Sequence, residues 1–595
     1  MAVTYAFGKF VFNLDEQTLD VGGEVHQLPQ KEFEILKMLV ENNGKLLSKE
    51  AMMSSIWRDT FVEESNLAQY VSRLRKTLNV DDQQYIETVS KRGYRFTADL
   101  VESPTVTTLE RHVTLQITNN APARAKSIGE IDSLAVLTFR VLGGGPDDDF
   151  LGLGLADALI TQLTRAGSLI VTPTSSVSKI RDQDLDPVTI GRQLGVDAIL
   201  LGNFQKAGTK LRLTVQMFEV AEGKALWAES FNNEIDDIFE VQDQIAKRIV
   251  DAFASKISVE SQQKIAKRFT EDSRAYNEYL RGRVFFASRT TEGLSNALMH
   301  FNRAIEFDPQ YALAYAGLSD VYQLLPNTDM MGPENAYLKA RAAALRALEL
   351  DDSIPEAHLS IAVCMMNYDW NFAGAEVSFK KAIELNPNLA QAHLHRGTML
   401  LRLGQIGDGA IALNRARTLD PLSPGPSAWL SEALAELGEY DSAIRMLLET
   451  TRIAPEYSLA HYFLATTYLR AGRFADASAA VDNALVRSDD MSLIRSARTL
   501  VKAFSGDVSG ARAEIDNLIA KRQQTYVSAT NIASGFAGIQ DSENVFKWLE
   551  IAYKEKDSHI TWINFDFEFK YLHDDPRFTD ILRRVNLAGN GDDKA

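Results

Sequence analysis

The sequence is poor in cysteine and contains no long apolar run. Cys364 is the single cysteine among 595 residues, so the chain cannot form an internal disulfide and fits a reducing compartment. No stretch is long and apolar enough for a membrane-spanning helix. The N-terminal residues lack the basic start and the apolar core of a secretion signal. These absences predict a cytoplasmic protein that is not associated with a membrane.

Sequence patterns of common enzyme classes are also missing. The chain has no His-Glu-x-x-His, no Gly-x-Ser-x-Gly and no Walker motif, and its nine histidines lack the spacing of a metal site. A glycine run at 143–145 is similar to a phosphate loop, but no Gly-Lys-Ser/Thr follows it, and Asp147–Asp149 would repel a phosphate. The sequence therefore predicts a protein that is not an enzyme and that holds no cofactor or metal.

Positive charge is scarce, because the formal net charge is −17. This value argues against a general binder of polyanions. Any contact with nucleic acid must therefore come from a local basic patch.

The sequence pattern changes several times along the chain. Strand-like runs and helices occupy residues 1–98, and a stretch rich in Thr, Ser, Asn and Pro covers 99–130. Alternating strands and helices fill 131–258, and a helical repeat runs through 259–595. We expect a multidomain α+β protein: a winged helix-turn-helix, a flexible linker, an α/β layer domain and an all-α superhelix.

The first domain is predicted to begin with strands and to continue with three helices. Its strand-like runs are Tyr5–Phe12, Thr18–Val21 and Glu24–His26. A first helix starts near Pro29 and stops before Gly44, since proline favours the first position of a helix and glycine the position after its end. Ser48 is placed to cap a second helix that ends near Trp57.

The third helix of this domain is amphipathic. Its apolar stripe, with spacing i, i+4, i+7 and i+11, consists of Leu67, Val71, Leu74 and Leu78. Its opposite face consists of Ser65, Asn66, Gln69, Tyr70, Ser72, Arg73 and Lys76. Asn, Gln and Arg side chains can pair bidentately with base edges in the major groove, whereas Arg75, nearer the flank of the helix, suits a phosphate. This helix is therefore the predicted reader of DNA.

A short hairpin follows the third helix. Residues 85–97 run as a strand through Thr88 and Ser90, turn at Lys91 and Arg92, and return as Gly93-Tyr94-Arg95-Phe96. A basic hairpin tip beside a recognition helix is the arrangement by which a winged helix grips the phosphates that flank a groove.

These first 98 residues resemble the winged-helix output domain of the OmpR/PhoB response regulators. The resemblance is carried by the leading strands, LPQKEFEILKMLVENNGKLLSKEAM, SRLRKTL and GYRF. It implies that Ser65, Asn66, Gln69, Tyr70, Ser72 and Arg73 face bases or backbone of double-stranded DNA, and that Thr88, Ser90, Lys91 and Arg92 belong to the wing. Relatives often have arginine where this chain has Ser65 and Ser72, and a second glycine is usual in the wing. Because no receiver domain precedes the winged helix, we expect its control to come from the residues that follow.

An alternative is a winged helix that binds protein. The first hundred residues hold twelve Lys/Arg and fifteen Asp/Glu, so the domain is not basic overall. However, its cations are segregated on the third helix and the wing: Arg73, Arg75, Lys76, Lys91, Arg92 and Arg95. This segregation favours DNA.

Residues 131–258 are predicted to form an α/β layer domain with a mixed five-strand sheet. The expected strands are Ser133–Phe139, Ser168–Val171, Ala198–Gln205, Lys210–Val220 and Ala225–Phe231, and the expected helices are Phe150–Arg165, Pro187–Leu194 and Ile235–Phe253. The motifs SLAVLTF, LADALITQL, LGVDAILLGNF and IFEVQDQIAKRI resemble the TolB-N-terminal-like (FlgO-like) domain, which implies no chemistry.

The last part of the chain repeats with a period of 34 residues. Small residues recur at Ala297, Ala340, Ala375, Gly409, Ala443, Ala477 and Ala511, with Val545 in step. This is the period of tetratricopeptide (TPR) repeats, in which small residues lie where two helices touch. The register slips by nine residues near Pro326–Pro333 and by one near Tyr368–Phe372, which we interpret as loop insertions. The C-terminal segment is expected to cap the stack with polar residues.

Stacked helix pairs form a superhelix whose concave groove suits a peptide or a helix. The repeat register places on its inner face Asn367, Gln391, Thr398, Arg402, Glu432, Glu436, Tyr462 and Arg470. We expect a protein or peptide partner in this groove. The paired asparagines and lysines of the family's chaperone-tail clamp are missing, so a C-terminal carboxylate is not the expected ligand. For each residue singly, a solvated helix position is the alternative.

Two hypotheses follow from the sequence. The first is a cytoplasmic, one-component, sequence-specific transcriptional regulator whose TPR and middle domains bind a partner or assemble a homo-oligomer. The second is an interaction scaffold in which the winged helix binds protein rather than DNA.

Overall fold

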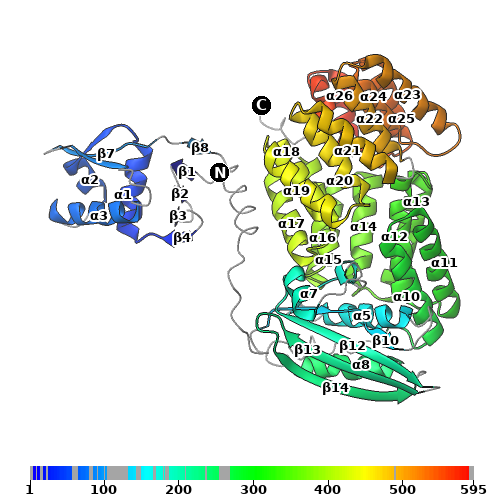
Figure 1. Ribbon diagram of the computed structural model, residues 1–595. Helices are drawn as coiled ribbons and strands as arrows, with labels where there is room; N and C mark the ends of the chain where they lie inside the picture. Colours follow the sequence, from blue (N-terminus) through cyan, green and yellow to red (C-terminus); the bar gives the residue numbers. More distant parts are fainter. Residues whose placement is uncertain are drawn as a thin grey trace. The chain divides into compact units, whose positions relative to one another are not determined.

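The computed structural model divides into two compact units, residues 1–121 and residues 122–595 (Figure 1). The structure describes residues 4–7, 10–13, 18–21, 24–56, 64–78, 85–89, 92–98, 101–103, 131–142, 149–164, 169–177, 180, 186–207, 210–234, 238–252, 269–487 and 491–587. None of the helices in these ranges combines the length and apolar character that a bilayer crossing requires.

The first unit is a winged helix built on two small sheets. The strands are β1(Thr4–Phe7), β2(Phe10–Asn13), β3(Thr18–Val21), β4(Glu24–Gln27), β5(Leu46–Ser48), β6(Ile86–Val89), β7(Gly93–Phe96) and β8(Val101–Ser103), and the helices are α1(Gln30–Glu41), α2(Lys49–Ile56) and α3(Glu64–Thr77). One sheet has the order β4-β3-β2-β1-β8 and the other β5-β7-β6. The run expected as one strand, Tyr5–Phe12, is two antiparallel strands, which places Tyr5 opposite Phe12 in the same core. The cap expected from Ser48 is confirmed, because its Oγ accepts a hydrogen bond from Ala51 N at 3.2 Å.

The second unit begins with a mixed sheet. Its elements are β9(Ser133–Val136), β10(Arg140–Leu142), α5(Asp149–Thr164), β11(Ile170–Val171), α6(Thr174–Val177), α7(Pro187–Leu194), β12(Ala198–Ala207), β13(Lys210–Glu219), β14(Ala225–Glu234) and α8(Ile238–Ala252). Five strands have the order β11-β9-β12-β13-β14, parallel up to β12 and antiparallel after it. The mixed character of the sheet and the antiparallel meander β12–β14 are as the sequence predicts. Strand β10, which also pairs with β12, is not predicted.

Helices cover both faces of this sheet. Apolar residues of α5 and α8 pack with Leu134 and Leu200 on one face. On the other face, Ile190 and Leu194 of α7 pack with Ile199. Gly195 ends α7 at a φ of 66°, as the sequence predicts, and Asp186, which was not predicted as a cap, caps the helix through Thr189 N.

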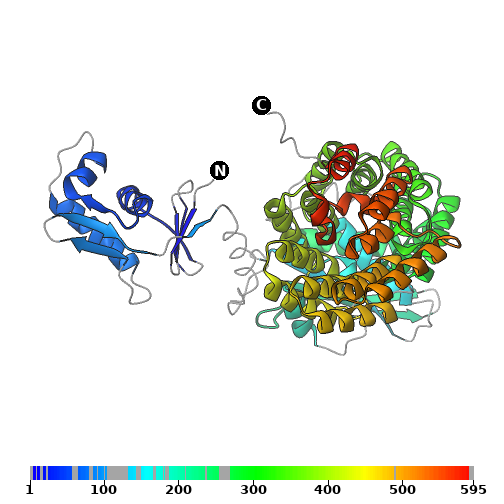
Figure 2. The same cartoon turned by 90° about the horizontal axis from the view of Figure 1, so that it is seen from above.

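The rest of the second unit is an array of helix pairs that curves into a superhelix (Figure 2). The pairs are α10(Ser273–Ser288) with α11(Thr291–Phe307), α12(Ala312–Leu324) with α13(Pro333–Leu350), α14(Pro355–Cys364) with α15(Phe372–Leu385), α16(Ala390–Arg402) with α17(Ile406–Leu419), α18(Pro424–Glu436) with α19(Tyr440–Ile453), α20(Ser458–Arg470) with α21(Phe474–Arg487), α22(Ser492–Phe504) with α23(Val508–Arg522), and α24(Ala529–Gly538) with α25(Ser542–Lys554). The small residues of the 34-residue period are buried between paired helices.

The nine-residue register slip is a loop insertion between α12 and α13, as the sequence predicts, whereas the one-residue slip is not. The one-residue slip is a π-helical turn, η5(Met365–Asp369), which takes up the extra residue at the end of α14. The nine-residue slip contains the 3-10 turn η4(Leu325–Thr328) and reaches across to the far end of the array. There the Asp329 carboxylate accepts hydrogen bonds from Ser492 N at 3.0 Å and from Lys521 Nζ at 3.3 Å. The insertion therefore ties the second repeat to the seventh.

The middle domain and the array pack together within the second unit. Asp420 of the array accepts hydrogen bonds from the hydroxyls of Ser175 and Ser176. Asn388 Nδ2 donates to Leu169 O at 3.0 Å, and Leu422 belongs to the same apolar cluster as α7. The residues between helix pairs of the array thus form a docking surface for the α/β layer.

The C-terminal segment differs from its prediction as a polar cap. The turns η6(Ser558–Trp562) and η7(Phe567–Leu572) pack against the first helices of the repeats, and α26(Pro576–Arg584) packs on α25. Trp562 stacks on Trp429 with ring centroids 4.6 Å apart, and Phe567 joins the core of the α18–α22 region. The aromatic residues of the segment explain why it packs on the inner face of the array, because packing there removes their large rings from water.

Two buried aspartates in this segment have opposite pKa shifts. Burial alone would raise the pKa of Asp557, but hydrogen bonds from His559, Ser528 and Thr530 hold this pKa at about 2. Burial, together with the nearby Glu568 and Glu432 carboxylates, raises the pKa of Asp566 well above its usual value. Asp566 makes no side-chain cap of η7.

Asp566→Asn is therefore expected to stabilise the second unit at neutral pH by about 1 kcal/mol. A carboxyl group whose pKa is raised by folding stabilises the folded state at acidic pH, and this stability is lost as the pH rises through the raised pKa. Urea unfolding of Asp566→Asn at several pH values should show a higher free energy of unfolding at neutral pH. This free energy should also depend less on pH than that of the unaltered chain. In the matched variant Asp557→Asn, loss of a hydrogen-bonded buried charge is expected to destabilise by about 2–3 kcal/mol. If both variants lost a similar amount of stability, the opposite pKa shifts assigned to Asp566 and Asp557 would be contradicted.

Candidate DNA-binding surface

The third helix of the winged helix, α3, presents two distinct faces. Its inner stripe of Leu67, Val71, Leu74 and Leu78 is buried in the core of the first unit, as predicted. On the outer face Gln69, Ser72, Arg73 and Lys76 are exposed, while Asn66 and Tyr70 are half-buried. The side chain of Ser65 lies outside the described part of the structure. The outer face thus offers amide, hydroxyl and cationic groups to an approaching duplex.

Arg73 is held loosely against a neighbouring helix. Its NH1 lies 3.7 Å from Glu32 Oε1 of α1, and its guanidinium lies 5.6 Å from the centre of the Tyr70 ring. The Arg73 side chain is 64% exposed. The Glu32 side chain is only 8% exposed, so a base or phosphate that takes the Arg73 guanidinium must offset the loss of the cation beside a buried carboxylate. Glu32 was not predicted as part of this surface, because its place beside α3 depends on helix packing.

Arg75 connects the helix to the wing. Its Nε and NH2 donate to Ile86 O at 3.0 and 2.8 Å, and NH2 also donates to Thr88 Oγ1 at 2.6 Å. Both partners belong to β6. The Arg75 guanidinium therefore positions the wing relative to α3, whereas the sequence predicts that it contacts a phosphate. Thr88 remains exposed on the same strand.

The wing is a tight hairpin between β6 and β7. Arg92 is exposed, and its backbone N–H donates to Val89 O at 3.0 Å to close the turn. Ser90 and Lys91, which the sequence places at the tip, lie outside the described residues. Arg95 pairs with Glu87 of the facing strand at 3.3 Å, so its charge is partly compensated within the hairpin.

Gly93 fixes how the wing packs on the rest of the unit. It lies opposite Ser48 in the β5–β7 pair and has a φ of 155°. A Cβ at this position would overlap the backbone carbonyl of Leu47. The close approach of two backbones explains why the hairpin needs glycine here.

The residues predicted to face a peptide groove are engaged within the chain. Arg402 lies over the Trp562 ring at 4.3 Å and donates to Asn367 Oδ1 at 2.7 Å. Arg470 donates to Glu432 and lies over the Phe567 ring at 5.1 Å.

The remaining predicted groove residues lie on the same inner face. Glu436 accepts a hydrogen bond from Lys570 at 2.7 Å, and Tyr462 packs on the cluster that contains Phe567. Thr398 is buried and donates to His395 O, and Gln391 is half-buried. In this structure the chain's own residues 558–572 thus contact Arg402, Glu436 and Arg470, three of the positions at which a partner was expected.

The histidines that share one repeat position have a structural role. His358, His393 and His461 each place Nε2 about 3 Å from a backbone carbonyl six residues earlier. Among the described residues no group of His, Cys, Asp and Glu side chains is arranged to hold a metal ion.

Comparisons with known families agree with this division of the chain. Residues 23–96 match the family model "Transcriptional regulatory protein, C terminal", and residues 130–248 match "HilA/YgeH-like transcriptional regulator, second domain". Residues 371–424 and 434–501 match tetratricopeptide repeat models. The middle domain, which we compared with the TolB-N-terminal-like domain, is thus similar to the second domain of HilA-like regulators.

Similar curated proteins include regulators. The chain is 25% identical to the transcriptional regulator HilA of Salmonella typhi over 422 residues, which is 70% of each chain. It is 29% identical over 239 residues to a putative adenylate cyclase 3 of Rhizobium meliloti (strain 1021), covering 39% of this chain and 40% of that protein. Among solved structures, the DNA-binding domain of E. coli CadC is 24% identical over 17% of this chain and 98% of its own, with a TM-score of 0.16.

The chain accordingly combines an OmpR/PhoB-type winged helix, a HilA-like second domain and TPR repeats. This combination is that of a transcriptional regulator.

Proposed function

We propose that the protein regulates transcription by reading specific double-stranded DNA with the exposed face of α3 and gripping phosphates with the wing. The observation that supports this most directly is the segregation of exposed polar and cationic groups on α3, opposite a buried apolar stripe. Recognition helices of winged helices present such a face to the major groove. A DNA-binding domain acts where the chromosome is, which in bacteria is the cytoplasm.

Within this surface the residues have different proposed roles. Gln69, Arg73 and the half-buried Asn66 and Tyr70 are proposed to face base edges or the adjacent backbone, together with Ser65 and Ser72. Lys76 and Arg92, with Ser90 and Lys91, are proposed to contact phosphates. Arg75 and Thr88 are proposed to set the angle between helix and wing, because Arg75 is bonded to β6.

The second unit is proposed to receive the signal that controls DNA binding. TPR repeats commonly bind protein or peptide, and HilA-like regulators carry a related middle domain. Because residues 558–572 occupy the inner face near α18 and α20, a peptide would reach it only by replacing them. A protein partner on other surfaces, or self-association that brings two winged helices onto paired half-sites, is the proposed route of control.

A scaffold in which the winged helix binds protein remains the second candidate. The ion pair between Glu32 and Arg73 favours it in one respect, since it lowers the net positive charge of the outer face. Negligible binding to every DNA sequence, with no dependence on salt concentration, would favour this candidate.

Arg73→Ala is expected to weaken binding to the preferred sequence by about 1–3 kcal/mol and to reduce the discrimination against unrelated sequences. Lys76→Ala is expected to weaken binding to all sequences alike and to lower the salt slope by about one. Affinities can be measured by fluorescence anisotropy on a sequence selected from a random library and on a scrambled duplex. Lys380→Ala, which removes an exposed cation of α15 in the second unit, is the control and should change neither affinity. Equal losses on both duplexes for Arg73→Ala would reassign this residue to phosphate contact.

A further inference from the structure

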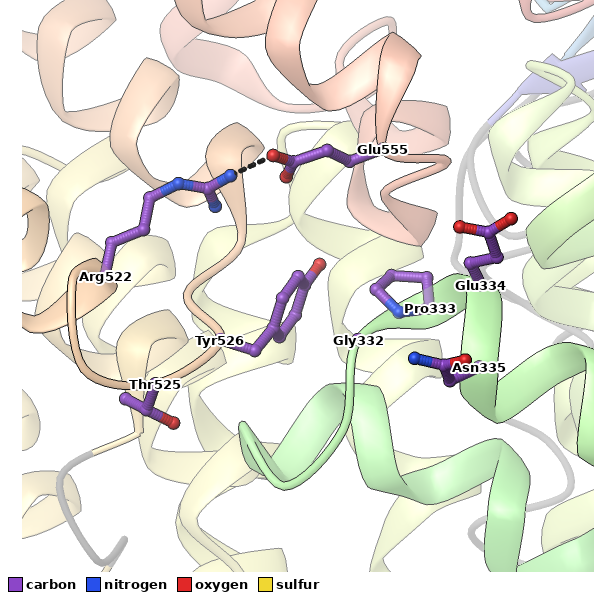
Figure 3. Close-up of a pocket in the computed structure, with 8 residues that line it drawn as sticks. All are labelled: Gly332, Pro333, Glu334, Asn335, Arg522, Thr525, Tyr526 and Glu555. Carbon is purple, nitrogen blue, oxygen red and sulfur yellow. Dashed lines mark hydrogen bonds and ion pairs between the residues drawn. The ribbon is translucent and has the colours of Figure 1, made fainter.

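A pocket lies where the two ends of the array are tied together (Figure 3). Its volume is about 310 Å³, and it is lined by Gly332, Pro333, Glu334, Asn335, Arg522, Thr525, Tyr526 and Glu555. One wall is the insertion before α13, and the other is the connection from α23 to α24 with the end of α25. The wall on the insertion is fixed, since Thr525 Oγ1 donates to Asp329 O at 3.2 Å beside the contacts of Asp329 with Ser492 and Lys521.

The first wall presents the start of a long helix. Gly332 is the N-cap of α13 and provides no side-chain cap, and Pro333 follows at the first position. The N–H groups of Glu334 and Asn335 are in the first turn, where a helix offers no internal acceptor and carries partial positive charge. Both side chains are exposed. The helix start therefore favours an anionic group, although the Glu334 side chain in the same turn carries an acidic group of its own.

The second wall presents two buried polar atoms without a hydrogen-bond partner in the described part of the chain. These atoms are the Tyr526 hydroxyl and Glu555 Oε2. The Tyr526 ring approaches Gly332, since a Cβ on Gly332 would lie 3.8 Å from Tyr526 Cδ2. In Figure 3 its hydroxyl points toward the space between Glu555 and Pro333. An unsatisfied buried polar atom costs about 1–3 kcal/mol, so a ligand that pairs with the Tyr526 hydroxyl would gain energy on this scale, whereas the Glu555 side chain is 37% exposed and would contribute less.

The Arg522 guanidinium is already used on this wall. It donates to Val527 O and to Glu555, and it lies over the Trp548 ring at 5.6 Å. Burial and the nearby Asp557 and Glu555 carboxylates raise the pKa of Tyr526 well above its usual value, so its hydroxyl keeps its proton and can donate. Glu555 Oε2 can only accept. The two walls thus require opposite kinds of group from one small molecule.

We propose that this pocket binds a free amino acid, with the ligand carboxylate at the first turn of α13 and the ligand ammonium at Glu555 Oε2. The Tyr526 hydroxyl, between the two walls, would donate to the carboxylate. The volume is at the lower end of the range for small-molecule sites. A ligand with a carboxylate alone would leave Glu555 Oε2 unpaired, and an amine alone would leave the helix start without an anion. This inference stands on the second unit and does not depend on DNA binding.

The test is isothermal titration calorimetry of the full chain with the twenty common free amino acids, one at a time. Propionate and propylamine, which carry one charge each, serve as ligand controls. We expect saturable binding of at least one amino acid, and no binding of either single-charge control. Tyr526→Phe and Glu555→Gln, which remove the hydroxyl donor and one carboxylate acceptor, are each expected to weaken this binding by about ten-fold. The matched variant Tyr571→Phe, at a tyrosine that is 42% exposed, should bind as the unaltered chain does.

Three results would overturn the proposal. The first is that no amino acid binds, in which case ordered water satisfies the two buried atoms. The second is equal binding of propionate or propylamine, which would exclude a zwitterion. The third is binding that neither Tyr526→Phe nor Glu555→Gln changes, which would place the ligand elsewhere.

Discussion

Gly93→Ala is expected to destabilise the N-terminal unit by about 3–5 kcal/mol and to remove its DNA binding. The added Cβ would overlap the carbonyl of Leu47, which is backbone and cannot turn aside. Strands β5 and β7 would have to separate, and the wing would lose its position relative to α3. Amide hydrogen exchange in β5 and β7 should become faster in Gly93→Ala, and the affinity for DNA should fall.

Gly44→Ala is the matched control for this substitution. Gly44 also has a positive φ, 76°, but a Cβ there would have no neighbour within 4 Å. Its expected cost is the conformational strain alone, about 1 kcal/mol. If the two variants lost the same stability, the close approach of Gly93 to β5 would not be what the wing requires.

Arg470→Met is expected to destabilise the second unit by about 3–5 kcal/mol. The side chains of Arg470 and Glu432 are 6% and 4% exposed, so the variant leaves a carboxylate buried without its cation. Asp566 and Glu568 face the same region, and the pKa of each is raised by burial and by neighbouring carboxylates, Glu432 among them. Urea unfolding followed by tryptophan fluorescence would measure the loss, because every tryptophan except Trp57 lies in this unit.

A double variant separates the buried charge from the packing of the side chain. Arg470→Met combined with Glu432→Gln removes both charges and is expected to recover much of the lost stability. Arg452→Met, which breaks an exposed pair with Glu449, should cost about 0.5 kcal/mol or less. A double variant as unstable as the single one would contradict the role given to the charge.

Local patterns in the sequence predict much of this fold. The apolar stripe of α3, the end of α7 and the 34-residue period are predicted from such patterns, and the structure confirms them. The two faces of the candidate DNA surface follow from the same spacing. A period of 3.6 residues is sufficient to separate Leu74 from Arg73.

Contacts between distant segments could not be predicted in this way. The tie between Asp329 and Ser492 joins residues 163 positions apart, and nothing near either residue indicates it. The same is true of Trp562 on Trp429, which fills the inner face of the array, and of Arg75 on β6, whose guanidinium suits a phosphate equally well. Side-chain chemistry alone does not decide which partner a cation takes.

The most direct test of the central claim is the salt dependence of DNA binding by the full chain. We expect log K for a selected duplex to fall linearly with log salt concentration, because cations of α3 and the wing displace counterions from phosphates. Weak binding with no dependence on salt would contradict the account and identify the winged helix as a protein-binding surface.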